Sequence, residues 1–400
     1  MTPRRIYLDH AATTPVRKEV REAMLPYLGE EAFGNPSSGH HFGRQARAGL
    51  ETARKQVAAA LGAQQREILF TSGGTEADNQ AILGCAMACC SGTDLRGAHI
   101  VASPIEHKAV LAALHEAERL GAHTTLLPVN RDGVIDLAAL DALLTGTMPG
   151  GKPSIVSVMW VNNETGVLQP IGEIAARCAA AGVAFHTDAV QALGKVPLRL
   201  SDHPGISVCS ISAHKIGGPK GVGAIFVRER KGVLPLLHGG GQQGGLRPGT
   251  ENVPGAVAIG VAAELAAAEQ PATASRLAAI RDAVEAALRQ QVPDLVVHSA
   301  GAPRGPNILL VSAPGTDSEA MLMHLDVAGL ACASGSACST GAVEPSHVLS
   351  AMGVPRDLAV AAVRMSFGSL SAADQVPVIA TTYGQVVAKV RELRRVLART

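Results

Sequence analysis

Apolar runs alternate with helical spacings along the first 260 residues of this 400-residue chain. Leu50, Ala53, Val57 and Leu61 recur at helical spacing before Gly62 and predict a helix over 41–61. Further periodic segments predict helices, and short apolar runs between them predict strands at 67–71, 99–103, 123–128, 154–161, 183–187, 206–211 and 222–227. This alternation predicts an α/β fold with a mostly parallel sheet covered by helices.

The pattern changes after the last of these strands. A glycine-rich segment over 238–250 precedes an alanine-rich helix from about Pro254, and the remainder predicts helices around a strand at 307–312. At this length two domains are expected. We predict a large domain over 15–260 and a smaller domain formed by 1–14 and 261–400.

Polar clusters fall where the predicted strands end. Ligands of parallel α/β sheets bind at the carboxyl ends of the strands. Five clusters at five strand ends therefore predict a binding site, and they comprise residues 71–75, Glu106 with His107, 162–164, Asp188 with Gln191, and 212–215.

Lys215 stands on a predicted turn after the buried strand 206–211. A lysine held there, partly out of water, can lose a proton and attack a carbonyl. Asp188 is suited to holding a protonated pyridine nitrogen, and His107 to stacking on the ring. Gly74 and Thr75 open a helix whose free amides favour an anion. Together these residues fit pyridoxal 5′-phosphate, although singly each is more often a surface charge, a packed histidine or a helix cap.

Seven cysteines occur, and one has a distinctive setting. Cys338 lies in a run of small residues over 333–341, which is typical of an exposed, mobile loop and favours a nucleophilic thiol. The spacing of Cys332 and Cys338 does not match a zinc site, so no metal is expected. We predict packing roles for the other five, which are Cys85, Cys89, Cys90, Cys178 and Cys209.

Composition narrows the class of substrate. With 35 basic and 34 acidic residues the net charge is +1, and no basic run indicates nucleic-acid or membrane binding. A small-molecule substrate is expected. The first ten residues lack the apolar segment of a secretory signal, and an odd number of cysteines favours a reducing compartment, so we expect a cytoplasmic protein.

Ordered motifs then reveal a resemblance that runs nearly from end to end. The chain resembles the cysteine desulfurases of the class V aminotransferase fold, in particular their short-loop group, the NifS- and IscS-like enzymes that supply sulfur for iron–sulfur clusters. The motifs are Tyr7–Pro15, Phe33–Ser38, Thr71–Glu76, Glu106–Lys108, Asn162–Gly166, His214–Lys215, Arg247–Thr250, Ser334–Cys338 and Arg364–Gly368.

The resemblance implies a pyridoxal-phosphate-dependent transferase fold and a set of roles. Lys215 would carry the cofactor and move the substrate Cα proton. Cys338 would take the sulfur of L-cysteine as a persulfide and release alanine. Arg364, with Asn35, would bind the substrate carboxylate. Gln191 would contact the ring hydroxyl of the cofactor. The other cofactor contacts would come from Gly74, Thr75, His107, Asn163, Asp188, Ser212 and His214, and from Thr250 of a second subunit in a homodimer.

Partners and alternatives also follow from the resemblance. The persulfide would pass to an acceptor such as an iron–sulfur scaffold protein, and tRNA thiolation is a further possible use. A selenocysteine lyase or a cysteine β-eliminase on the same fold remains an alternative, in which Cys338 would be dispensable. A scaffold that binds an assembly partner is the alternative from another class. His10, Gly217 and Pro248 differ from the residues that are common in the family, and they leave the fine substrate and partner preferences open.

Overall fold

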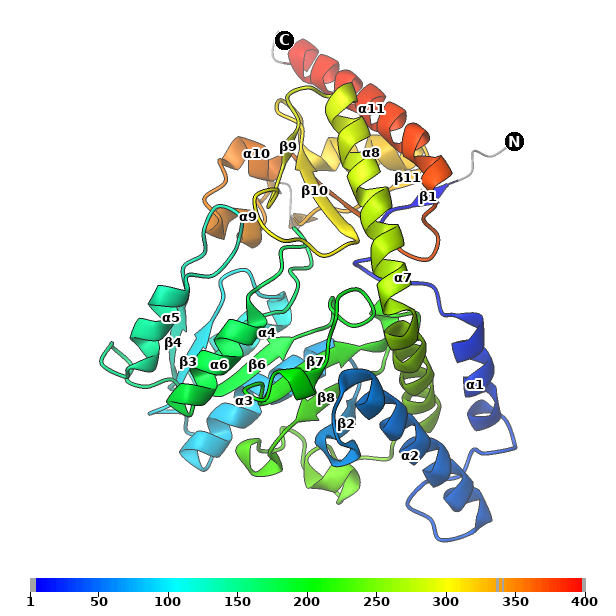
Figure 1. The fold of residues 1–400 in the computed structure, drawn as a ribbon, viewed down its shortest axis with the longest axis vertical. Helices are drawn as coiled ribbons and strands as arrows, with labels where there is room; N and C mark the ends of the chain where they lie inside the picture. The colour runs from blue at the N-terminus through cyan, green and yellow to red at the C-terminus, as the bar shows by residue number, and fades with distance from the viewer. Residues whose placement is uncertain (1–4, 336–337, 340–341, 398–400) are drawn as a thin grey trace.

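A seven-stranded sheet forms the centre of the larger part of the molecule (Figure 1). The structure, a computed structural model, describes residues 5–335, 338–339 and 342–397. Among the described strands of this sheet only β8 runs in the opposite direction to the other six. In spatial order the strands are β2 (Ile68–Thr71), β8 (Gly223–Val227), β7 (Val208–Ser212), β6 (Ala184–Asp188), β5 (Ile155–Ser157), β3 (His99–Ala102) and β4 (His123–Leu126).

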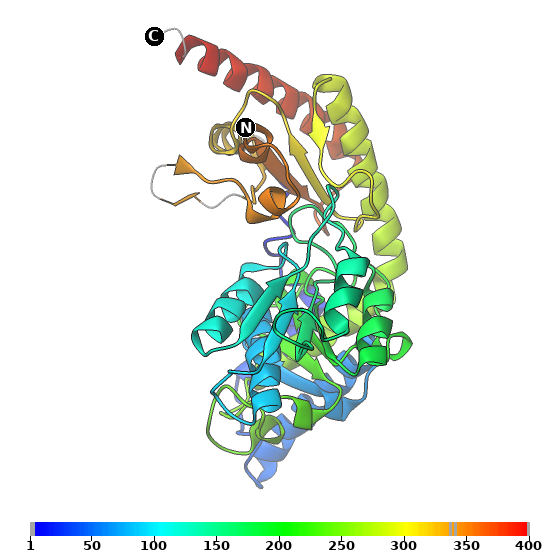
Figure 2. The same cartoon turned by 90° about the vertical axis from the view of Figure 1, so that its left-hand side faces the viewer.

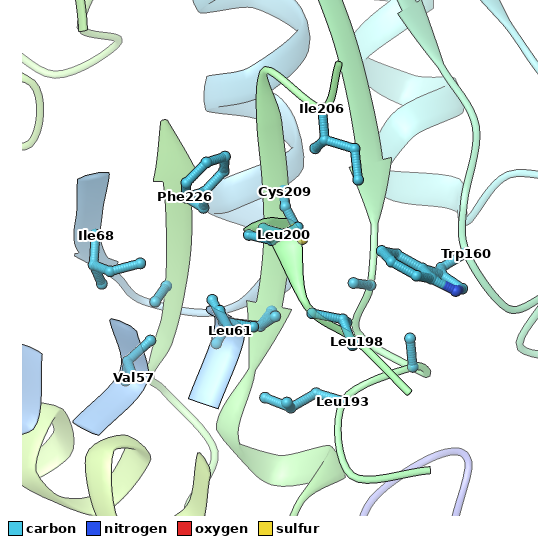
Figure 3. Close-up of a cluster of buried hydrophobic side chains, with 14 of the residues drawn as sticks. Val57, Leu61, Ile68, Trp160, Leu193, Leu198, Leu200, Ile206, Cys209 and Phe226 are labelled. Carbon is cyan, nitrogen blue, oxygen red and sulfur yellow. The ribbon is translucent and has the colours of Figure 1, made fainter. Parts of the chain in front are cut away.

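Both faces of the sheet are covered because its strands are apolar on both sides. In β8, Ala224 and Phe226 pack into one cluster, whereas Ile225 and Val227 pack into the other. Helices on the Phe226 face are α2 (His41–Leu61), α5 (Leu137–Leu144), α6 (Ile171–Ala181) and the first half of α7 (Val253–Gln291). The opposite face carries α3 (Gly74–Cys90) and α4 (Lys108–Arg119). Figure 3 shows part of the first cluster, with Phe226 and Ile68 above Leu61.

Helix α2 shows how local sequence sets an element's limits. It spans His41–Leu61, which confirms the predicted range. His40 caps its start by accepting a hydrogen bond from the Gly43 amide, and Gly62 ends it in the left-handed conformation, φ 64°. By contrast, β5 is shorter than the predicted strand 154–161, because the Met159 amide donates to the Glu106 carboxylate, 2.8 Å away.

A second, smaller sheet lies beyond the first (Figure 1). Its antiparallel strands are β14 (Ala362–Ser366), β10 (Ile308–Ser312) and β9 (Val296–Val297), and a separate apolar cluster joins them to the second half of α7. The other helices of this part are α8 (Ser318–Val327), α9 (His347–Ala351), α10 (Arg356–Val360) and α11 (Val376–Leu397). The remaining elements include helix α1 (Lys18–Leu28), the paired strands β1 (Ile6–Tyr7) and β11 (Leu330–Ala331), and the hairpin of β12 (Cys338–Ser339) and β13 (Ala342–Val343).

Helix α7 belongs to both parts of the molecule. Its residues up to Ala263 pack against the large sheet, and those from Leu277 onward pack against the small one. The N-terminal segment also joins the two parts, because β1 pairs with β11 while Thr14 bonds to the backbone of His214. The carboxyl ends of the parallel strands, where the polar clusters lie, therefore face the junction between the two parts of the molecule. None of the helices in the described ranges is both long and apolar enough to cross a membrane.

Truncating a core leucine tests this packing. Leu61 is 0% exposed at the end of α2, whereas Leu28, at the end of α1, is 63% exposed. Leu61→Ala leaves a cavity and should cost about 2–5 kcal/mol, whereas Leu28→Ala should cost about 0.5 kcal/mol or less. Thermal unfolding followed by circular dichroism compares the two variants, and an equal loss in both would contradict the packing described here.

Candidate active site

The carboxyl ends of the parallel strands and the small sheet enclose a cavity of about 340 Å³. Strand β7 ends at Ser212, and a 3-10 turn over Ala213–Lys215 directs Lys215 toward this space. The structure brings ten of the predicted site residues to its wall. They are Gly74, Thr75, His107, Asn163, Asp188, Gln191, Ser212, His214, Lys215 and Arg364.

The backbone of the N-terminal segment holds the Lys215 amine in place. Its Nζ donates to the carbonyl oxygens of Ala11 and Ala12, each 2.7 Å away. Burial lowers the pKa of Lys215 to about 8, helped by the charge of Arg364 and opposed by the carboxylates of Asp188 and Asp9. A lysine with such a pKa has a large neutral fraction near pH 8 and is competent as a nucleophile.

Asp188 is the last residue of β6 and is buried. One of its oxygens, Oδ1, accepts a hydrogen bond from the Val190 amide at 2.8 Å. Burial raises the pKa of Asp188, whereas His107 in its protonated form, the hydrogen bond from the Val190 amide and the charge of Lys215 oppose that rise. A cationic group bound in the cavity would favour the ionised carboxylate.

A second carboxyl, which the sequence analysis did not single out, lies on the same wall. Asp78 is buried on α3, its Oδ1 is 3.7 Å from Nε2 of His186, and that oxygen has no hydrogen-bond partner among the described residues. Burial and the neighbouring Asp188 charge raise the pKa of Asp78 well above its ordinary value. We therefore expect the ionised state at Asp188 and the protonated state at Asp78.

His107 begins helix α4 as its capping residue. Its Nδ1 accepts a hydrogen bond from the Ala109 amide at 3.2 Å, which leaves the proton of the neutral ring on Nε2. Burial lowers the pKa of His107, opposed by the charge of Asp188 and aided by the charge of Lys215. The ring is therefore neutral at physiological pH and free to stack or to exchange a proton at Nε2.

One end of the cavity is suited to an anion. Helix α3 begins at Gly74, so its first amides and its dipole favour negative charge there. A Cβ at Gly74 would lie 3.0 Å from Cγ2 of Val190, so glycine keeps this space open. The nearby Glu76 carboxylate is paired with Arg247 at 2.8 Å, which limits its repulsion of an anion. Thr75, Ser212 and His214 lie on the same cavity wall.

Arg364 enters the cavity from the small sheet. Its guanidinium donates to Asp9 Oδ1 at 2.8 Å and to the Asn163 carbonyl oxygen at 2.9 Å. Its Nε is buried without a hydrogen-bond partner among the described residues. A guanidinium that is already oriented by two oxygen acceptors and lies on the wall of an open cavity is suited to a carboxylate ligand.

The segment that carries Cys338 is attached beside this arginine. The backbones of Ala333 and Arg364 exchange two hydrogen bonds, of 3.1 and 2.7 Å. Gly335 packs so closely on Glu164 that no Cβ would fit there, and on the far side of the segment the Ser346 hydroxyl donates to the same carboxylate. Figure 2 shows the β12–β13 hairpin projecting from the molecule. The Cys338 side chain, together with Ser336 and Ala337, lies outside the described residues.

Two predicted site residues do not line the cavity. Asn35 is exposed, and its Oδ1 accepts a hydrogen bond from the Ser37 amide at 2.9 Å. Thr250 is exposed beside a different cavity of about 250 Å³, and its expected role requires a second subunit. One packing prediction is wrong: Cys89 is exposed, because it falls on the outer side of the last turn of α3.

Other residues of the site were not predicted. They are Asp9, Ala11, Ala12, Asp78, Met159 and Val190 around the cavity, and Lys195 behind Gln191. Asp9 lies in the motif Tyr7–Pro15, and Asp78 lies one helical turn after Gly74. Both positions could therefore have been predicted to lie near the site. Nothing in the local sequence indicates that Lys195 is buried.

A family model for class-V aminotransferases matches residues 6–379, and the chain belongs to that family. A protein of Dictyoglomus turgidum described as cysteine desulfurase IscS is 42% identical over 391 residues, which are 98% of this chain and 96% of that protein. At this identity over nearly the whole length, the chain falls among the cysteine desulfurases of the family.

Solved structures agree with this assignment. A NifS-like protein superposes with a TM-score of 0.87 at 32% identity, and the match covers 96% of this chain and 100% of that one. A structure described as SspA in complex with cysteine has a TM-score of 0.76 at 31% identity, covering 90% and 98% of the two chains. The predicted class V aminotransferase fold is thereby confirmed.

The lowered pKa of Lys215 can be measured on the cofactor-free protein. The rate at which a dilute amine-reactive acylating reagent modifies Lys215, measured by mass spectrometry, should rise with pH with a midpoint near 8, because only the neutral amine reacts. In the urea-unfolded protein the same lysine should titrate near its ordinary value of about 10.4. A single midpoint shared by the folded and unfolded protein would contradict the account of burial.

Proposed function

We propose that this chain is a pyridoxal-phosphate-dependent cysteine desulfurase that converts L-cysteine to L-alanine and takes the sulfur as a persulfide on Cys338. One observation carries the proposal. The cavity that holds the Lys215 amine, the buried Asp188 and the opening of α3 also holds Arg364, whose backbone is hydrogen-bonded to the segment leading to Cys338. The cavity that contains Lys215 and the segment that leads to Cys338 are therefore joined at Arg364.

The cavity has the chemistry that pyridoxal phosphate requires. The phosphate would lie at the start of α3, near Gly74, Thr75, Ser212 and His214, where the open space at Gly74 and the free helix amides favour it. Ring contacts would come from His107, Asn163, Asp188 and Gln191. When bound, the cofactor supplies an aldehyde for the Lys215 amine and an electron-withdrawing ring.

The protein's own groups then have distinct tasks toward the substrate. Arg364 binds the L-cysteine carboxylate through its guanidinium, which Asp9 and the Asn163 carbonyl hold in place. Lys215 Nζ, with a pKa of about 8, removes the Cα proton and returns a proton to the product. His107 Nε2 is available for proton exchange at the substrate sulfur.

Sulfur transfer balances without an external oxidant. The Cys338 thiolate attacks the substrate sulfur, an S–S bond forms, and the Cβ–S bond breaks with its electron pair on carbon. Protonation of that carbon gives alanine, and Cys338 is left as a persulfide. A thiol on a hairpin between two anchored ends, Ala333 and Ser346, is suited to meet the substrate and then an acceptor.

The proposal extends to partners. Because Thr250 is exposed and lines a different cavity from the one that holds Lys215 in its own chain, we propose that it completes the phosphate site of a second subunit in a homodimer. Asn35 would assist Arg364 with the substrate carboxylate. A protein acceptor such as an iron–sulfur scaffold would take the persulfide sulfur, and tRNA thiolation is a second use of the same sulfur. We place this chemistry in the cytoplasm.

Replacement of Cys338 separates the proposal from its rivals. Protein loaded with pyridoxal phosphate should form alanine and sulfide in equal amounts from L-cysteine under reducing conditions. Cys338→Ser should lower alanine formation by at least about 100-fold, because a hydroxyl cannot accept the sulfur. Cys89→Ser, which changes an exposed thiol outside the site, is the matched control and should retain activity.

If alanine is not formed, or if Cys338→Ser keeps full activity, the products identify which alternative function is correct. Pyruvate and ammonia in place of alanine would show a β-eliminase, and full activity of Cys338→Ser with selenocysteine would show a selenocysteine lyase. A Lys215→Ala protein that still supports cluster assembly would point to the scaffold role.

A further inference from the structure

Lys195 is a buried lysine behind the cofactor cavity, only 7% exposed. It follows Gln191 by four residues, and its Nζ donates to Gln191 Oε1 at 3.3 Å. Within the described ranges it forms no ion pair with a carboxylate. Burying an ammonium without a counter-charge is unfavourable, so its presence beside the site calls for a functional explanation.

A continuous set of hydrogen bonds links Lys195 to Lys215. Nε2 of Gln191 donates to the Ala11 carbonyl oxygen at 2.9 Å, and Lys215 Nζ donates to the same oxygen at 2.7 Å. Because an ammonium can only donate, Lys195 holds the Gln191 oxygen toward itself and thereby turns the Gln191 amide group toward Ala11 and the cavity. Lys195 thus sets the orientation of Gln191, which is a predicted cofactor contact, from the side away from the cavity.

The two lysines also share a second, smaller cavity of about 150 Å³ on the far side of the N-terminal segment. His10 lies on its wall, and both ring nitrogens of His10 are buried without a partner among the described residues. The titratable and charged groups that face Lys195 or this cavity are Lys215, His10, His214, Arg276 and the ion pair of Arg17 with Glu269. Cations outnumber acids there.

We propose that Lys195 is a positioning residue that acts through Gln191: it orients the Gln191 amide, which would contact the ring hydroxyl of the cofactor, and holds a positive charge behind that amide. With the cofactor bound, this charge would favour the ring oxygen as an anion and disfavour a proton on the nitrogen that joins Lys215 to the cofactor. That anion would in turn keep Lys195 protonated above the pKa of about 7 that it has in the cofactor-free protein. The inference rests on the proposed function, because it assumes pyridoxal phosphate in the main cavity.

The cofactor-free protein reports on the buried charge without any catalysis. Burial, with the charge of Lys215, lowers the pKa of Lys195 to about 7 from an ordinary value of about 10.5. Between these values the unfolded chain binds more protons than the folded one, so this lysine's penalty on stability is full below pH 7 and disappears as pH rises toward 10.5.

Lys195→Met should therefore raise the melting temperature of the cofactor-free protein at pH 7 by at least about 2 °C, and the gain should shrink toward pH 10. Lys231→Met, at an exposed lysine, is the matched control and should change little at either pH. A Lys195→Met protein that is less stable than wild type at pH 7 would show that the charge has a stabilising partner, and would overturn the inference.

The loaded protein reports on the positioning role. The visible absorbance of bound pyridoxal phosphate changes when the nitrogen joining it to Lys215 gains a proton, and its pH midpoint is read by titration. Lys195→Met should raise this midpoint by on the order of one pH unit, whereas Lys195→Arg, which keeps the charge, should stay within a few tenths of a unit of wild type.

The outcomes separate the two proposals. A wild-type cofactor band with the same midpoint in Lys195→Met overturns the role of Lys195 and leaves the proposed function intact. A wild-type protein that never develops the band refutes the proposed function, and the inference about Lys195 falls with it.

Discussion

The structure depends on one constraint: a lysine amine must be held out of water at the edge of a sheet without a carboxylate in direct contact. Lys215 meets it because β7 delivers the chain to the junction of the two apolar cores, where the carbonyl oxygens of Ala11 and Ala12 accept its hydrogen bonds. Backbone carbonyls orient the amine but add no full charge. Its pKa therefore falls to about 8, and the amine becomes reactive.

The junction between the two cores gives the site its second property. The large sheet supplies the acid and the anion-binding helix start, whereas the small sheet supplies Arg364 and the attachment of the Cys338 segment. Helix α7 and the N-terminal segment pack against both parts and connect them. Catalytic groups from opposite ends of the sequence thereby face one cavity.

Much of this arrangement was predictable because it follows from local patterns. The limits of α2 came from helical spacing and Gly62, and the cavity residues came from the rule that ligands bind at strand ends. Lys195 and Asp78 were missed because their burial arises from tertiary packing. The end of β5 was misplaced because the Glu106 carboxylate binds its backbone. Cys89 was assigned to the core because a helix end does not reveal which side faces solvent.

The central claim is that Lys215, rather than its buried neighbour Lys195, carries the cofactor. Borohydride reduction of the protein loaded with pyridoxal phosphate fixes the cofactor to the amine that holds it, and peptide mass spectrometry identifies that amine. The account predicts a pyridoxyl group on Lys215 alone, at one per chain. A label on Lys195, or a label spread over exposed lysines, would contradict it.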